Sequence, residues 1–258
     1  MKKLFSALLI LLCCLSAQAE NDHVRIARDN APAVVAVNTV RKDGSTFTGT
    51  GFVLTPDGLI ATTRHVSDDT LYINITFNNG VVSGEAVTVL SAGDVDLSLL
   101  KIQALNLPTV RLADSDKVQT GQPITVIGNP RRLQNTVTAG LISQVRKKSN
   151  GVIWHQISAP ISPSSSGSPV FNADGEVISI AFASYSGNNN QNLNFAVPSN
   201  YLAKLVQRAG YSLPQKDAGP QTAPSAQTNN AFIAHIKKAW VILKRLLRVD
   251  NPKGPTEK

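Results

Sequence analysis

The main pattern between residues 31 and 197 is a series of short β-branched runs separated by turn residues. Runs such as AVVAVNTV, YINITF and PITVIGN alternate with turn stretches such as PDG, NNG and ADGE. About a dozen runs at a spacing of roughly 8 to 12 residues, with no long amphipathic helix between them, are typical of antiparallel barrels or sandwiches. The pattern therefore predicts an all-β domain.

One helix is predicted to close this domain, in the stretch SNYLAKLVQRAGY at residues 199–211. Ser199 or Asn200 would cap its start, and Gly210 would end it. The apolar side would comprise Leu202, Leu205 and Val206. The domain is therefore expected to span residues 20–213.

The residues after this domain divide into a linker and a basic helix. Residues 214–230 are rich in Pro, Gln, Ala, Ser and Thr and are predicted to form a flexible linker. Residues 231–249, AFIAHIKKAWVILKRLLRV, place apolar and basic residues on opposite sides at about 100° per residue. Residues 250–258 are expected to be disordered.

The basic amphipathic helix 231–249 carries five Lys and Arg side chains and one tryptophan. Five charges argue against a transmembrane helix, whereas anionic membrane surfaces attract this pattern. Peripheral membrane association is one interpretation. Docking on the protein's own core or on a second subunit, and binding to a partner protein, stay open.

The first nineteen residues have the pattern of a secretory signal peptide. Lys2 and Lys3 precede an apolar run, and Ala17-Gln18-Ala19 has the small-x-small form of a cleavage site. Both cysteines, Cys13 and Cys14, lie in this segment, so disulfides and cysteine-based chemistry are not expected after it. Export is predicted, with a bacterial periplasm favoured and secretion or a cell-surface location as alternatives.

The charge of the chain is concentrated in its tail. The formal net charge is +8, of which Lys2 and Lys3 contribute +2. Residues 231–258 hold seven Lys and Arg against two acidic residues, or +5, which leaves +1 for residues 20–230. A nucleic-acid-binding surface on the main domain is therefore not indicated.

Five serines occur in the stretch SPSSSGSP, residues 162–169, and one of them could be a nucleophile. A serine hydroxyl needs an adjacent base, and that base needs a group to orient it. Among four histidines, His65 is the best candidate because it lies where an apolar run passes into a loop. His23 is expected in a frayed N-terminus, His155 in a strand with a satisfied hydrogen bond, and His235 in the tail helix.

Two aspartates compete for the orienting role in the stretch GDVDLSLLKI. Asp94 is predicted to lie in a turn, whereas Asp96 leads directly into the buried run LSLLKI. Because an orienting carboxylate is usually buried against its histidine, Asp96 is favoured.

Several stretches together carry a family resemblance, and they extend from about residue 47 to residue 202. In order they are GTGFVLTPDGLIATTRHV, DLSLLKI, VIGNP, TVTAGLIS, ISPSSSGSPVFNADGEVISI and LNFAVPSNYL. This series resembles the protease domain of the HtrA/Deg family of trypsin-fold serine proteases. The resemblance implies two six-stranded antiparallel β-barrels with the active site in the cleft between them.

The resemblance also implies a role for each site residue. Ser166, the serine followed by Gly-x-Pro, would be the nucleophile, His65 the general base and then acid, and Asp96 the orienting group. The backbone N–H groups of Ser164 and Ser166 would stabilise the oxyanion. No metal or organic cofactor is needed for this chemistry.

Three residues depart from the family pattern. Ser164 and Ser168 stand where the family has glycine, and Arg64 replaces a polar residue before the histidine. If position 164 needs a positive φ, its Cβ costs about 1 to 2 kcal/mol. An oxyanion hole that forms only on substrate binding, or an inactive site, would be a consequence.

The substrate pocket of this fold is shaped partly by residues about six positions before the nucleophile, here Pro160 and Ile161. Because no carboxylate lies there, cleavage after Lys or Arg is not expected. A small or medium apolar residue, such as Val, Ala or Leu, is predicted instead.

The main functional hypothesis is an exported serine endopeptidase that acts on unfolded or extended polypeptides. One alternative is a catalytically inactive trypsin-fold binding or scaffold protein that acts through its C-terminal helix, and another is an esterase or similar acyl-transfer enzyme. The family usually carries a PDZ domain after the protease domain, but only about 45 residues follow position 213, so none is expected here. Family members often form trimers, and a homo-oligomer is left open.

Overall fold

The computed structural model describes residues 22–129, 135–187 and 190–214. The predicted signal segment 1–19, the basic helix 231–249 and nearly all of the linker therefore lie outside the described residues. The helices are α2 (Asp22–Asn30), α3 (Arg64–Ser67) and α4 (Ser199–Arg208), with short 3-10 helices η1 (Ala31–Ala33) and η2 (Ser115–Lys117). No helix in the described ranges is both long enough and apolar enough to cross a membrane.

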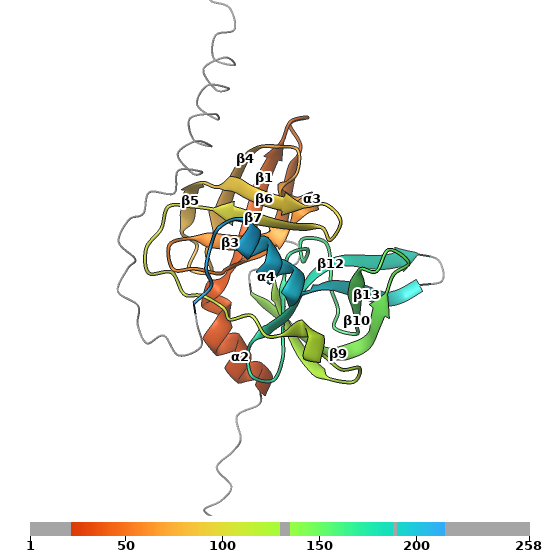
Figure 1. Cartoon of the computed structure of the whole chain (residues 1–258). Helices are drawn as coiled ribbons and strands as arrows, with labels where there is room; N and C mark the ends of the chain where they lie inside the picture. The colour runs from red at the N-terminus through yellow and green to blue at the C-terminus, as the bar shows by residue number, and fades with distance from the viewer. Residues whose placement is uncertain (1–21, 130–134, 188–189, 215–258) are drawn as a thin grey trace, which may run out of the picture. The chain divides into compact units, whose positions relative to one another are not determined.

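The first half of the domain is a seven-stranded antiparallel sheet, in the order β5-β4-β1-β2-β3-β7-β6. Its strands are β1 (Val34–Arg41), β2 (Thr46–Val53), β3 (Leu59–Thr63), β4 (Thr70–Thr76), β5 (Val82–Glu85), β6 (Val87–Ala92) and β7 (Leu97–Lys101). Figure 1 shows most of these strands together in the upper part of the domain.

The two edge strands of this sheet are consecutive in the chain and are separated only by Ala86. The N–H of Ala86 donates to Ile73 O on β4 over 2.8 Å, and the next residue, Val87, already pairs with Lys101 on β7. The stretch 82–92 therefore changes its partner strand at Ala86. If residues 82–92 are counted as one bent strand, the first half has six strands, which is the number that the resemblance implies.

The second half of the domain is a closed six-stranded barrel, in the order β10-β13-β12-β11-β8-β9. Its strands are β8 (Pro123–Gly128), β9 (Thr136–Lys147), β10 (Ile153–Ile157), β11 (Pro169–Phe171), β12 (Val177–Gly187) and β13 (Asn190–Pro198). All neighbouring strands are antiparallel. The all-β fold class is confirmed.

The hydrophobic core of the first half continues into the second. Phe171 and Val197 from the second barrel belong to the same buried cluster as Phe52 and Leu99 from the first sheet. A separate, smaller cluster around Ile124 and other small or branched residues fills the second barrel. The two halves thus pack against each other through buried apolar side chains, which fixes their relative position.

Helix α4 contacts strands of both halves, and Figure 1 shows it between the two groups of strands. Its three predicted apolar residues are buried: Leu202, Leu205 and Val206. The predicted cap was wrong, because Pro198 occupies the N-cap position without a side-chain hydrogen bond. Instead, Ser199 Oγ donates to Ala113 O and Asn200 Nδ2 donates to Asp114 Oδ1. Both side chains therefore attach α4 to the two residues that directly precede η2.

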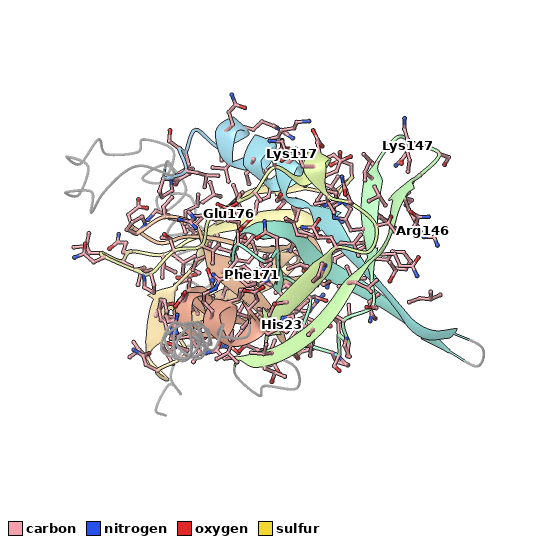
Figure 2. The ribbon with its side chains drawn as sticks, turned by 90° about the horizontal axis from the view of Figure 1, so that it is seen from below. His23, Lys117, Arg146, Lys147, Phe171 and Glu176 are labelled. Atoms are coloured by element: carbon pink, nitrogen blue, oxygen red, sulfur yellow. The ribbon has the colours of Figure 1, made fainter. Side chains whose placement is uncertain are left out.

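The expectation that His23 lies in a frayed N-terminus was also wrong. His23 belongs to α2, and its Nδ1 lies 2.7 Å from Thr125 Oγ1 on β8 (Figure 2). Ile26 of the same helix is buried in the core, with 1% of its surface exposed. Burial of one apolar side chain thus anchors a helix whose other residues are mostly polar.

His155 lies in β10, as predicted, and its Nδ1 is 2.6 Å from Ser179 Oγ. Its side chain is buried, and burial lowers its pKa from 6.5 to about 4 because the imidazolium form is poorly solvated. The folded protein therefore holds His155 neutral at pH 7.

We expect the free energy of unfolding to fall in mild acid because His155 is buried in its neutral form. Because its pKa is lower in the folded than in the unfolded state, its contribution is complete above pH 6.5 and is lost as the pH falls from 6.5 to 4. The loss should reach on the order of 3 kcal/mol at pH 4. Urea unfolding of the parent and of His155→Gln at pH 7.5 and 4.5 measures this loss, which should be larger in the parent. An equal loss of unfolding free energy in both proteins would contradict the prediction.

Candidate active site

His65 and Asp96 form a paired contact at the end of β3. The Nδ1 atom of His65 lies 2.6 Å from Asp96 Oδ2, and the backbone N–H of His65 donates to Asp96 Oδ1 over 3.0 Å. His65 follows β3 as the second residue of α3, and Asp96 immediately precedes β7, which pairs with β3. Adjacent strands therefore bring the two side chains together.

The choice between the two aspartates is clear in the structure. Both oxygens of Asp96 face His65, whereas Asp94 is an exposed turn residue. Asp96 has a φ of +54°, which is uncommon for a residue with a side chain. In addition, the N–H of Arg64 donates to the backbone oxygen of Asp96 over 3.0 Å. These contacts hold the carboxylate against the imidazole.

Ser166 lies in the loop between β10 and β11, next to the first half of the domain. The N–H of Thr50 on β2 donates to Ser166 O over 2.8 Å. A Cβ atom added at the neighbouring Gly49 would lie 2.5 Å from Val66 of α3 and 3.2 Å from Ser166 O. The loop that carries Ser166 and the helix that carries His65 therefore meet at the same point of β2.

The hydroxyl of Ser166 makes a long contact, 3.4 Å, with the backbone oxygen of Phe182. Within the described part of the chain, no hydrogen bond joins Ser166 to His65. Catalytic hydrogen bonds are often long without substrate and tighten when it binds. The structure thus brings the His65–Asp96 pair and the Ser166 loop to one region, with the Ser166 side chain still turned toward β12.

Ser164 adopts the left-handed conformation, with φ of +75°. Its backbone oxygen accepts a hydrogen bond from Thr50 Oγ1 over 2.8 Å. The N–H groups of Ser164 and Ser166 donate to no other described residue, whereas those of Ser165, Gly167 and Ser168 all have backbone acceptors. Two unused donors therefore flank Ser165 in this loop.

Ser168 fits only because its neighbour on β8 is a glycine. A Cβ atom at Gly128 would overlap the Ser168 hydroxyl. Ser168 is fully buried, and its hydroxyl has no hydrogen-bond partner among the described residues. The serine in place of the family's second glycine is thus accommodated by packing.

Pro160 and Ile161 line a cavity of about 100 Å³ behind the loop. Its other walls are Val126, Gly128, Thr136, Thr138, Ser162, Ser165 and Ser168. Among the described residues that line it, none carries a charged side chain, and Ser166 is not one of them. The assignment of Pro160 and Ile161 to a substrate pocket stays a prediction.

Two further side chains, those of Phe47 and Arg41, lie close to His65. Phe47 meets the imidazole edge-on, with ring centroids 6.4 Å apart, and the Arg41 guanidinium lies over Phe47 and donates to His65 O over 2.9 Å. Arg64, whose influence on His65 the sequence left open, pairs at the surface with Asp68 at 3.3 Å. Its charge is therefore directed to a neighbouring carboxylate.

The sequence did not single out Thr50, Phe47 or Arg41. Thr50 lies in the stretch GTG, and a hydroxyl between two glycines in a strand could have indicated a close approach to another backbone. Phe47 and Arg41 carried no comparable signal. Across the described ranges, no three His, Cys, Asp or Glu side chains are arranged to hold a metal ion.

Several known proteins are similar to this chain in sequence and in fold. The family model described as a trypsin-like peptidase domain matches residues 49–180. The chain is 37% identical over 166 residues to a probable periplasmic serine endoprotease, DegP-like, of Marinomonas sp., which covers 62% of this chain and 35% of that protein. It is also 37% identical over 159 residues to the putative serine protease HhoB of Synechocystis sp., covering 58% and 37%. The chain spans about a third of the length of these relatives.

Two solved structures have a similar fold. The HtrA-type protease AlgW with a tripeptide has a TM-score of 0.67 and 29% sequence identity, covering 72% of this chain and 62% of that one. The serine endoprotease from Yersinia pestis has a TM-score of 0.65 and 30% identity, covering 74% and 68%.

The φ of Ser164 leads to a prediction for stability. Because a side chain is disfavoured in the left-handed region, Ser164→Gly should stabilise the fold by about 1 kcal/mol. Urea unfolding of the parent and the variant measures the difference. No gain in the free energy of unfolding would contradict it.

Gly167, three residues further along the loop, provides the opposite control. It also has a positive φ, of +91°, but a Cβ atom there would overlap Thr50 O. Gly167→Ala should therefore destabilise the protein by more than about 2 kcal/mol in the same measurement, from strain and overlap together.

Proposed function

The chain belongs to the trypsin-like peptidase domain family and resembles its HtrA/DegP members, and from this we propose that it is a serine endopeptidase that cleaves polypeptides. The observation that carries the proposal is the two-point contact between Asp96 and His65, close to a serine loop with two unused backbone donors. This arrangement has the elements of acyl-transfer chemistry.

In the first half of the proposed reaction, Ser166 Oγ attacks the carbonyl carbon of the scissile peptide bond. His65 Nε2 takes the hydroxyl proton as the new C–O bond forms, and Asp96 stabilises the imidazolium through Nδ1–H. The negative charge on the carbonyl oxygen would be met by the N–H groups of Ser164 and Ser166. The Ser166 hydroxyl must first turn away from Phe182 O.

In the second half, His65 gives the proton to the leaving amine, the C–N bond breaks, and an acyl-enzyme on Ser166 remains. Water then attacks the acyl carbon while His65 again accepts a proton. The breakdown of this intermediate releases the new carboxylate and returns the proton to Ser166. No atom outside the chain, the substrate and water is required.

The proposed substrate is an unfolded or extended polypeptide with a small or medium apolar residue before the cleaved bond. The described residues that line the cavity with Pro160 and Ile161 are uncharged, which is compatible with this preference. None of these described lining residues supplies a carboxylate that would select Lys or Arg. The chain's proposed location is the periplasm, since relatives are named periplasmic endoproteases and residues 1–19 have a signal pattern.

Reaction with a fluorophosphonate probe tests the proposal directly. Because only an activated serine reacts, the parent should gain one adduct in intact mass, and Ser166→Ala should gain none. Ser165→Ala is the matched control from the neighbouring position and should label like the parent. A parent that stays unlabelled, even with unfolded protein present, would instead favour the alternative of a binding protein without catalysis.

The two aspartates offer a second matched pair in the same experiment. Asp96→Asn should slow labelling and peptide cleavage by roughly 10³- to 10⁴-fold, because the imidazole loses its orienting carboxylate. Asp94→Asn, in the exposed turn, should behave like the parent. Equal rates for the two variants would contradict the role assigned to Asp96.

We further propose that residues 231–249, outside the described residues, attach the protein to anionic membranes. The separation of five cations from an apolar side with a tryptophan supports this. The processed full-length protein should float with anionic vesicles at low salt, while a chain ending at Leu213 should not. Equal flotation would remove this hypothesis and favour docking of the helix on protein.

A further inference from the structure

The side chain of Thr50 connects three segments that are distant in sequence. Its Oγ1 donates to Ser164 O over 2.8 Å and accepts from the N–H of Asn129 over 3.0 Å. Its backbone N–H donates to Ser166 O over 2.8 Å. Thr50 is completely buried, so water cannot replace these partners.

Thr50 is itself held from the other side. The hydroxyl of Thr62 on β3 donates to Thr50 O over 2.7 Å, which fixes the peptide that follows Thr50. The flanking Gly49 and Gly51 allow the backbone of β2 to approach closely, since a Cβ atom at Gly49 would press on Ser166 O and one at Gly51 on Ala61 O. A chain of hydrogen bonds therefore runs from β3 through Thr50 to the serine loop.

The two carbonyl groups that Thr50 binds lie on either side of Ser165. Fixing Ser164 O and Ser166 O restricts the rotation of the peptide units between them, and with it the direction of the Ser166 N–H. The same bonds hold Ser164 at φ of +75°, where a serine would not stay unaided. Without this support, a rotation of the preceding peptide would relieve the strain and redirect the Ser164 N–H.

We propose that Thr50 is a positioning residue that keeps the serine loop assembled for oxyanion binding before any substrate or activator arrives. The proposal rests on the proposed function, because it concerns the same two N–H donors. It also explains how a serine can occupy position 164: the hydrogen bonds from Thr50 stabilise a positive φ that a glycine would adopt without steric cost. The backbone donors of Ser164 and Ser166 are thus in place before substrate binds, whereas the Ser166 hydroxyl still has to turn toward His65.

Three variants test the proposal, compared by peptide cleavage and by fluorophosphonate labelling. Thr50→Val keeps the shape of the side chain but removes the hydroxyl, so kcat should fall roughly 10- to 100-fold with little change in KM. Thr50→Ser keeps the hydroxyl and should stay within about threefold of the parent. Thr48→Val removes a buried hydroxyl on the same strand that donates to Asn38 instead, and it should match the parent.

Hydrogen exchange supplies a readout that does not need activity. Deuterium uptake by the loop at residues 160–168 should rise in Thr50→Val and stay at the parent level in Thr48→Val and Thr50→Ser. If Thr50→Val is too unstable to purify, Thr50→Cys, a weaker donor of similar size, takes its place with the same expected direction.

The outcomes separate the two proposals. Cleavage and loop exchange that are the same in Thr50→Val and Thr48→Val would overturn the role of Thr50. A parent that is not labelled, but whose loop exchange still depends on the Thr50 hydroxyl, would uphold the positioning role and reject the catalytic function. A loss expressed mainly as a higher KM would also overturn it, because the hydroxyl would then act on substrate binding.

Discussion

The hydrogen bonds between β2 and the serine loop are the constraint on which the candidate site depends. Thr50 binds the carbonyl groups of Ser164 and Ser166 from the first half of the domain, while the loop itself belongs to the second half. Gly167 must be a glycine because its neighbour in space is Thr50 O. The loop is therefore placed by a strand that lies more than a hundred residues earlier in the chain, and its unusual backbone follows from that contact.

Neither half of the domain could form the candidate site alone, because each half supplies different residues of it. The first half supplies His65 and Asp96, joined because β3 and β7 are neighbours in the sheet. The second supplies Ser166 on the loop between β10 and β11. A shared apolar core, to which both Phe171 of the second half and Phe52 of the first belong, sets their relative position. Small shifts in that packing would move Ser166, the proposed nucleophile, relative to His65, its proposed base, and a displacement of about 1 Å can cost a hundredfold in rate.

The sequence was informative where the chemistry is local. Short β-branched runs identified the strands, and the run following Asp96 favoured it over Asp94; Asp96 is the one of the two that contacts His65. The glycine-to-serine change at position 164 correctly raised the question of a positive φ. The same local reasoning failed at α2, because the order of a mostly polar helix depends on Ile26 reaching a core formed by distant strands. It also failed at the cap of α4, because the side chains of Ser199 and Asn200 bond to residues 113 and 114 and not to the start of the helix.

By itself, the sequence determined the all-β class, the basic character of residues 231–249 and the candidates His65 and Asp96, since these follow from residue type, periodicity and position along the chain, whereas the choice of Ser166 among five serines came from the family resemblance. Only the tertiary structure decided that Ser164 is held by Thr50, that Ser168 is accommodated by Gly128, and that the stretch 82–92 joins both edges of the first sheet at Ala86. Each of these depends on which backbones come within hydrogen-bonding or van der Waals distance. That distance is set by the packing of segments far apart in sequence, and no local pattern encodes it.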